Sequence, residues 1–214
     1  MKLKLSYQTQ HLPAPYAFSA TFSVEISEVI HVALVLTYLD REDLSEEEIL
    51  AEGYSLEDDF SWEGQLGANW IYPIKELVRK ERTQEPLDSF YLHIAVDDEE
   101  WFPAVVDDVV VQELLQAVFE AKKKEAPLTI SFATSKYEQI DLTWKFAERT
   151  VYHKELALSW DEAHTLMRLI YSNEFEEMKA FKKPQVNSFS FDGQVWFVVD
   201  APDIWKQLKK LLQG

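Results

Sequence analysis

The feature that most constrains this chain is a set of short segments that occur twice and predict an internal duplication. In chain order, the matching pairs are Leu3–Thr9 with Leu128–Thr134, Leu44–Glu48 with Leu158–Glu162, Ser89-Phe90 with Ser188-Phe189, and Trp101-Phe102 with Trp196-Phe197. The offset between copies falls along the chain from 125 to 95 residues, as expected if the second copy has shorter loops. We therefore predict repeat one over residues 1–126 and repeat two over residues 127–214.

Both repeats show the same predicted order of elements. Apolar residues alternate with polar ones over 16–27 and 138–147, which is the period of a strand that buries one face. Ser45 and Glu48 form a capping-box pattern that opens a helix, and Ser159 begins a similar pattern. We predict a tandem pseudo-repeat of β-β-β-α-β-β-α units. This is an α+β fold of mainly antiparallel sheets with helices packed on one face.

In repeat one, three later elements complete this prediction. We expect a short helix over 74–82, a hairpin of strands 89–96 and 101–106, and a helix over 107–124. The Trp-Phe pairs that begin at Trp101 and Trp196 occupy matching strand positions. We interpret them as core anchors rather than binding platforms, because a folding module must bury its largest side chains.

The composition excludes several classes of protein. There are five glycines in 214 residues, and neither a GxGxxG nor a GxxxxGK[ST] pattern is present, which argues against the common nucleotide-binding enzymes. There is no cysteine, so disulfides, thiolate nucleophiles and cysteine-based metal sites are excluded. The N-terminus lacks the apolar region of a standard signal peptide. A reducing compartment suits such a chain, and we predict a cytoplasmic protein.

The net charge of −17 is unevenly divided. Residues 1–126 carry a charge of −16, whereas residues 127–214 carry −1. Nucleic-acid backbones and anionic membranes would be repelled by repeat one, so we expect neither as a partner. A basic protein is the partner that this charge favours.

No constellation of residues indicates catalysis or metal binding. The five histidines show no metal-ligand spacing, no GxSxG motif marks a serine, and the acidic run Asp97–Glu100 lacks the spacing of a calcium loop. We expect no cofactor, no metal and no catalytic residue. In the alternative that the protein is an enzyme or a small-ligand receptor, its site would lie between the repeats and use His153, His164 or inward carboxylates.

The sharpest candidate for a functional segment is the stretch where the two repeats differ most, about residues 51–87. It holds three of the five glycines and interleaves aromatic residues with carboxylates. Such residues can grip a cationic or amphipathic partner. The candidate partner-binding residues are Tyr54, Asp58, Asp59, Phe60, Trp62, Trp70 and Tyr72. The opposing interpretation is a lid that packs its tryptophans on repeat one and leaves its acids in water.

We therefore expect a non-enzymatic binding, scaffold or inhibitor-type protein that engages a protein partner through the acidic, aromatic face of repeat one. The sequence also leaves open a ligand-binding protein or enzyme with its site between the repeats, and a domain that serves homo-oligomerisation. It does not determine the oligomeric state.

Overall fold

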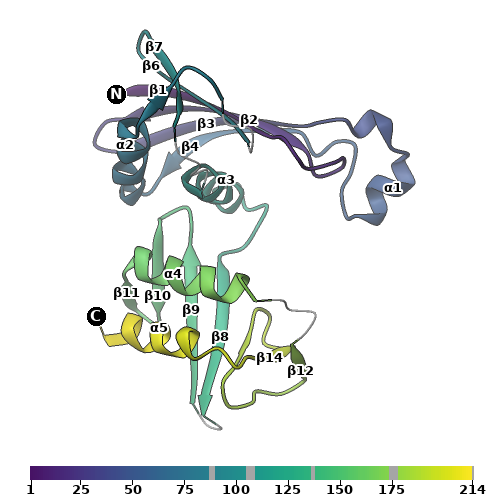
Figure 1. Cartoon of the computed structure of the whole chain (residues 1–214), viewed down its shortest axis with the longest axis vertical. Coiled ribbons are helices and arrows are strands. Elements are labelled where there is room, and N and C mark those ends of the chain that lie inside the picture. The colour runs from purple at the N-terminus through teal and green to yellow at the C-terminus, as the bar shows by residue number, and fades with distance from the viewer. Residues whose placement is uncertain (87–89, 105–108, 136–137, 174–177, 214) are drawn as a thin grey trace. The chain divides into compact units, whose positions relative to one another are not determined.

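The protein folds as two compact units, Met1–Lys124 (unit 1) and Glu125–Gly214 (unit 2). The computed structural model describes residues 1–86, 90–104, 109–135, 138–173 and 178–213. Each unit contains one seven-stranded antiparallel sheet with a few helices packed against it (Figure 1). This confirms the predicted α+β class.

In unit 1 the strand order is β4-β3-β2-β1-β6-β7-β5. The strands are β1 (Lys2–Thr9), β2 (Phe18–Ile26), β3 (Ile30–Tyr38), β4 (Phe60–Leu66), β5 (Arg82–Thr83), β6 (Phe90–Val96) and β7 (Glu99–Pro103). The helices are η1 (Arg41–Asp43), α1 (Glu46–Ala51), η2 (Ala68–Trp70), α2 (Ile71–Arg79) and α3 (Val109–Ala121).

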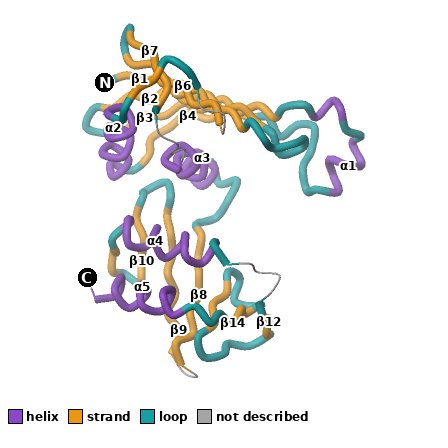
Figure 2. Tube along the Cα trace, viewed as in Figure 1, coloured by secondary structure: helices purple, strands orange, loops and turns teal. Residues whose placement is uncertain are grey.

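The unit 1 sheet buries one of its faces, as the period-two alternation predicts. Leu5, Phe22 and Leu34 lie opposite one another on β1, β2 and β3, and their side chains are buried. Ile74 of α2 and Leu114 of α3 are completely buried with them, so both helices cover this inner face (Figure 2). The intervening residues of the strands point to the outer face, which carries mostly small or polar side chains.

The predicted elements of repeat one shift slightly. Helix α2 begins at Ile71 rather than at residue 74, because Pro73 fits within the first helical turn, where its missing N–H has no intrahelical acceptor. The hairpin is formed by β6 and β7, with residues 89, 105 and 106 of the prediction outside the described residues. The helix predicted over 107–124 is α3, which spans Val109–Ala121, and residues 107 and 108 lie outside the described residues.

Unit 2 repeats this arrangement, with the strand order β11-β10-β9-β8-β13-β14-β12. The strands are β8 (Leu128–Ser135), β9 (Glu138–Lys145), β10 (Thr150–His153), β11 (Leu156–Leu158), β12 (Lys179–Phe181), β13 (Ser188–Ser190) and β14 (Trp196–Val198). Helices α4 (Trp160–Tyr171) and α5 (Pro202–Gln213) contact each other, and both bury apolar residues. Trp101 and Trp196 are both buried, as predicted for core anchors, whereas Phe102 and Phe197 beside them are half-buried.

The two sheets have the same topology, which fits a duplication. Replacing β4, β3, β2, β1, β6, β7 and β5 by β11, β10, β9, β8, β13, β14 and β12 converts one strand order into the other. The order shared by the units is β-β-β-β-α-β-β-β-α. It contains two strands more than the predicted repeat, namely β4 and β5 in unit 1 and β11 and β12 in unit 2. Strands β5, β11 and β12 are too brief for a hydrophobic period to show.

The topology relocates the extra segment of repeat one. Strand β4 and helix α2 have counterparts in β11 and α4, so residues 60–79 belong to the shared fold. The unshared segment is the connection between β3 and β4, residues 39–59, whose equivalent in unit 2 is residues 154–155. The sequence instead suggested an insertion over about 51–87. That alignment paired the capping boxes of α1 and α4, yet α1 lies inside the extra connection.

Candidate binding arm

The connection between β3 and β4, called the arm here (residues 39–59), concentrates the negative charge of the protein. It holds ten acidic residues and one basic residue, a net charge of −9 out of −17 for the whole chain. Nine of the ten acids are exposed, and Asp58 is half-buried. Helix α1 lies in the arm, beyond the ends of the strands (Figure 1). The arm is thus an acidic projection from one end of the unit 1 sheet.

Large apolar side chains are exposed on and beside this acidic projection. Leu50 and Leu56 of the arm are each 57% exposed. Leu12 and Tyr16, in the connection between β1 and β2 (residues 10–17), are 50% and 37% exposed. Tyr16 contacts the arm directly, since its ring packs edge-on against Tyr54 and its hydroxyl hydrogen-bonds the Glu52 carboxylate. Charge and exposed apolar surface therefore occur together, as in surfaces that bind proteins.

A buried arginine holds the arm in place. Arg41, the one base of the arm, is 6% exposed. Its guanidinium donates to the carbonyl oxygens of Pro15 and Ser55 and forms an ion pair with Asp58, with 3.1 Å between Nη1 and Oδ2. This group joins three stretches of chain, because Pro15 precedes β2 whereas Ser55 and Asp58 follow α1. A buried guanidinium needs hydrogen-bond acceptors and an ion-pair partner of this kind, because its charge is costly to desolvate.

Aromatic rings enclose the same guanidinium. The Arg41 Cζ lies 3.7 Å from the ring centroid of Tyr38 and 4.7 Å from that of Tyr54. The two rings also contact each other edge-on, with their centroids 5.7 Å apart. Cation–π contacts of this kind strengthen when the cation is desolvated. Arg41 therefore serves as the structural centre of the arm, and its charge is not available to a partner.

The rest of the arm is ordered by local rules. Ser45 and Glu48 form the predicted capping box, with each side chain hydrogen-bonded to the backbone N–H of the other. Ile49 is completely buried, so α1 is anchored by one apolar side chain. Gly53 follows α1 with a φ of 80°, in the left-handed region that favours glycine at the end of a helix.

The ionisation of Asp58 makes the arm sensitive to acid. Burial alone would raise the pKa of Asp58, but hydrogen bonds from the Ser55 backbone and hydroxyl, together with Arg41, lower the pKa below its ordinary value of 3.8. A depressed carboxyl pKa stabilises the folded form above the unfolded-state value, and that contribution is lost as the pH falls through the folded-state value.

We therefore expect the arm to be fully ordered at neutral pH and to loosen as the pH falls below about 3.8. Near-ultraviolet circular dichroism of the tyrosines around Arg41 would follow the change, since the rings lose their fixed environment. An Asp58→Asn variant should lack this acid transition. An unchanged transition in that variant would assign the acid response to other carboxylates.

The seven residues singled out from the sequence do not form one surface. Tyr54 and Asp58 surround Arg41, and Asp59 accepts a hydrogen bond from the Tyr38 N–H at 2.7 Å. The other four lie outside the arm: half-buried Phe60 and Trp62 on β4, completely buried Trp70, and Tyr72, which is 71% exposed.

Three residues of the arm were missed by sequence reasoning. Arg41, Leu50 and Leu56 lie in the arm, but the candidate set contained none of them. Arg41 does carry a signal, because a single base among ten acids is a natural partner for one of them. The exposure of Leu50 and Leu56 has no such signal, since a leucine beside a capped helix is ordinarily a core residue.

The histidines do not assemble a site within the described residues. His153 lies on β10, where its Nδ1 is 3.1 Å from the Asp141 carbonyl oxygen, and His164 lies half-buried on α4. A search of the described part of the chain finds no cluster of His, Asp and Glu arranged to hold a metal ion.

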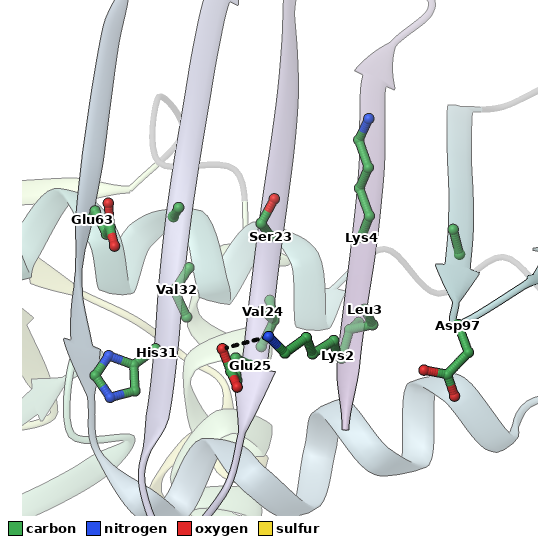
Figure 3. Close-up of a pocket in the computed structure, with 12 residues that line it drawn as sticks. Lys2, Leu3, Lys4, Ser23, Val24, Glu25, His31, Val32, Glu63 and Asp97 are labelled. Atoms are coloured by element: carbon green, nitrogen blue, oxygen red, sulfur yellow. Dashed lines mark ion pairs between the residues drawn. The ribbon is translucent and has the colours of Figure 1, made fainter.

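Apart from the arm, the outer face of the unit 1 sheet carries a hollow of about 670 Å³. The small residues Ser23, Ala33 and Ala95 line it together with charged side chains from four parts of the sheet (Figure 3). Lys2 there pairs with Glu25, with 3.4 Å between nitrogen and oxygen. The lining holds two lysines and three carboxylates, so neither sign of charge dominates the hollow.

Comparisons with known proteins add no relative. The chain matches no protein-family model, and neither the curated proteins nor the solved structures include a significant match. Among the described helices, none has the length and apolar character needed to cross a membrane. The function must therefore be inferred from the arm and the sheet themselves.

Proposed function

We propose that this protein is a non-enzymatic binding protein whose arm docks on a basic surface of a partner protein. The observation that carries the proposal is the combination found in residues 39–59. This segment carries nine exposed carboxylates and two exposed leucines, and it has no counterpart of similar length in unit 2. Inhibitor-type binding, in which the arm covers a basic site of the partner, is one form of this function.

The contacts of Arg41 support this proposal. A connection of this length costs conformational entropy when it is ordered, and a loop that only joined β3 to β4 would need no such cost. Here Arg41, Ile49 and the Ser45 capping box order the connection before any partner arrives. Preorganisation of a binding loop improves affinity because less entropy is lost on association.

The charges and the leucines would play different parts. Among the ion pairs of the described residues, Arg41–Asp58 is the one that involves an arm carboxylate, so the exposed acids are not internally neutralised. Exposed charges mainly accelerate and orient association. Burial of Leu50 and Leu56 would supply affinity, about 1.5–3 kcal/mol for each fully buried side chain.

The test is a leucine variant with a matched control. Covalent crosslinking in cell extract first identifies the partner, and binding of the purified partner is then measured. A Leu50→Ser/Leu56→Ser variant is expected to bind at least tenfold more weakly, with its thermal unfolding nearly unchanged because both side chains are exposed. The control is Leu156→Ser in unit 2, where Leu156 is 59% exposed. Equal binding by both variants would remove the arm from the interface.

A further inference from the structure

Strand β4 is much longer than the strands at the other three edges of the two sheets. Strands β5, β11 and β12, which end the sheets at the other three edges, have two, three and three residues. Strand β4 has seven, and it is paired with β3 from Leu66 opposite Ile30 to Phe60 opposite Leu36. Natural sheets often avoid edge-to-edge pairing by keeping edge strands short. A long, regular edge is therefore a candidate for pairing with another chain.

Two hydrogen bonds establish which groups of β4 face outward. The Tyr38 N–H points toward the β4 side, because it donates to Asp59 at 2.7 Å. Successive residues of an antiparallel strand point their N–H and C=O groups to opposite sides, so Leu36 and Leu34 also bond toward β4. Their partners Phe60 and Trp62 then bond inward, and Ser61, Glu63 and Gln65 point outward. The carbonyl oxygen of Ser61 agrees, since it accepts from Lys122 Nζ at 2.9 Å on that side.

Most of this outer edge is unoccupied within the described residues. Lys122 occupies the outward carbonyl oxygen of Ser61. No hydrogen bond from the described residues reaches the outward N–H and C=O groups of Glu63 and Gln65. Strand β4 contains no proline and keeps an unbroken register with β3. The edge thus offers two donors and two acceptors in the geometry of a sheet.

The side chains beside this edge specify the chemistry of an added strand. On the inner face, Phe60 and Trp62 are half-buried. The Trp62 ring lies across Gly64, where an added Cβ would come within 2.4 Å of a ring atom. On the outer face, Glu63 and Gln65 are exposed. An added strand would therefore place alternate apolar side chains beside the rings and basic side chains beside Glu63.

We propose that β4 receives an extended segment of a partner protein as an eighth, antiparallel strand, and that this segment alternates apolar and basic residues. This inference deepens the proposed function, from which it takes the basic character of the partner. A second copy of this chain is the less favourable occupant. Two β4 strands paired across a two-fold axis would bring their Glu63 residues together, in molecules that each carry a charge of −17.

The test uses an eight-residue synthetic peptide of alternating lysine and valine. In antiparallel pairing, the peptide residue opposite Glu63 has its side chain on the same outer face of the sheet as Glu63, and its N–H points toward β4. That residue would be a lysine. Two further peptides carry N-methyl groups on the lysines only or on the valines only, with the same charge and side chains. Titrated against the full chain, the lysine-methylated peptide should bind at least tenfold more weakly than the parent, and the valine-methylated peptide should bind comparably.

Amide exchange and a proline variant give independent readouts. In the free protein the amides of Glu63 and Gln65 should exchange faster than those of Trp62 and Gly64, and the parent peptide should slow the first two. A Glu63→Pro variant removes an outward N–H that β3 does not use, so it should keep the sheet and lose at least tenfold in peptide affinity. Glu63→Gln, which keeps the N–H, should lose less.

The outcomes separate this inference from the proposed function. Equal binding of the two methylated peptides would overturn strand addition and leave the arm free to act by charge and apolar contact. Faster exchange of Glu63 and Gln65 that the peptide does not slow would overturn it as well. If Glu63→Pro fails to fold, the methylated pair still decides. Loss of partner binding in the leucine variant bears on the arm alone.

Discussion

Replacing Arg41 by methionine is expected to disorder the arm and to lower the free energy of unfolding of unit 1 by about 2–3 kcal/mol. The change would leave Asp58 without its ion-pair partner, and the carbonyl oxygens of Pro15 and Ser55 without their donor. The cost falls below that of a fully buried pair because the Asp58 side chain is 28% exposed. Denaturant unfolding would measure the loss, and amide exchange would locate it in residues 39–59.

The control for this variant is Arg79→Met. Arg79 forms an exposed ion pair with Glu76 one helical turn away, and such pairs contribute less than about 0.5 kcal/mol. If the Arg41 variant were as stable as Arg79→Met and its arm amides stayed protected, Arg41 would not be the centre of the arm. An additional Asp58→Leu change should restore part of the lost stability, because removing both members of a buried pair leaves no unpartnered charge.

The second large effect is expected from Trp70, which the sequence placed beside Tyr72 in the same candidate surface. Trp70→Ala should destabilise unit 1 by about 3–5 kcal/mol, since the side chain of Trp70, the last residue of η2, is completely buried. Tyr72→Ala should change stability by less than about 0.5 kcal/mol, because its side chain is 71% exposed. Thermal unfolding of the two variants measures the difference. Similar losses from both would contradict the separation of core and surface.

The strands that the sequence predicted well are those whose signal is local. The alternation in β2 and β9 follows directly from burial on one face, so the residues themselves carry it. Strand β4 carries a weaker signal because Gly64 interrupts its apolar positions, and Phe60 and Trp62 are only half-buried at the sheet edge. Its identity as a strand depends on β3, a partner that no local pattern names.

The sequence alignment of the two copies matched strands that are equivalent in the two sheets, but it also matched the capping boxes of two helices that are not equivalent. Trp101 and Trp196 are both buried, on the equivalent strands β7 and β14. The boxes at Ser45 and Ser159 look alike because capping is a rule for any helix start, whichever helix follows. The acidity of the arm was visible in composition, whereas the role of Arg41 depends on Pro15, a residue distant in sequence.

The contact of Arg41 with Pro15 makes the connection between β1 and β2 and the connection between β3 and β4 depend on each other. The connections 10–17 and 39–59 are both long in unit 1, and their counterparts in unit 2 are short. Shortening 10–17 alone would remove the Pro15 carbonyl oxygen that accepts from the buried Arg41 guanidinium, and shortening 39–59 alone would remove the Tyr54 ring and the Glu52 carboxylate that contact Tyr16. The two connections therefore form one structural module. We expect them to be gained or lost together in evolution, and they should be grafted together in protein design.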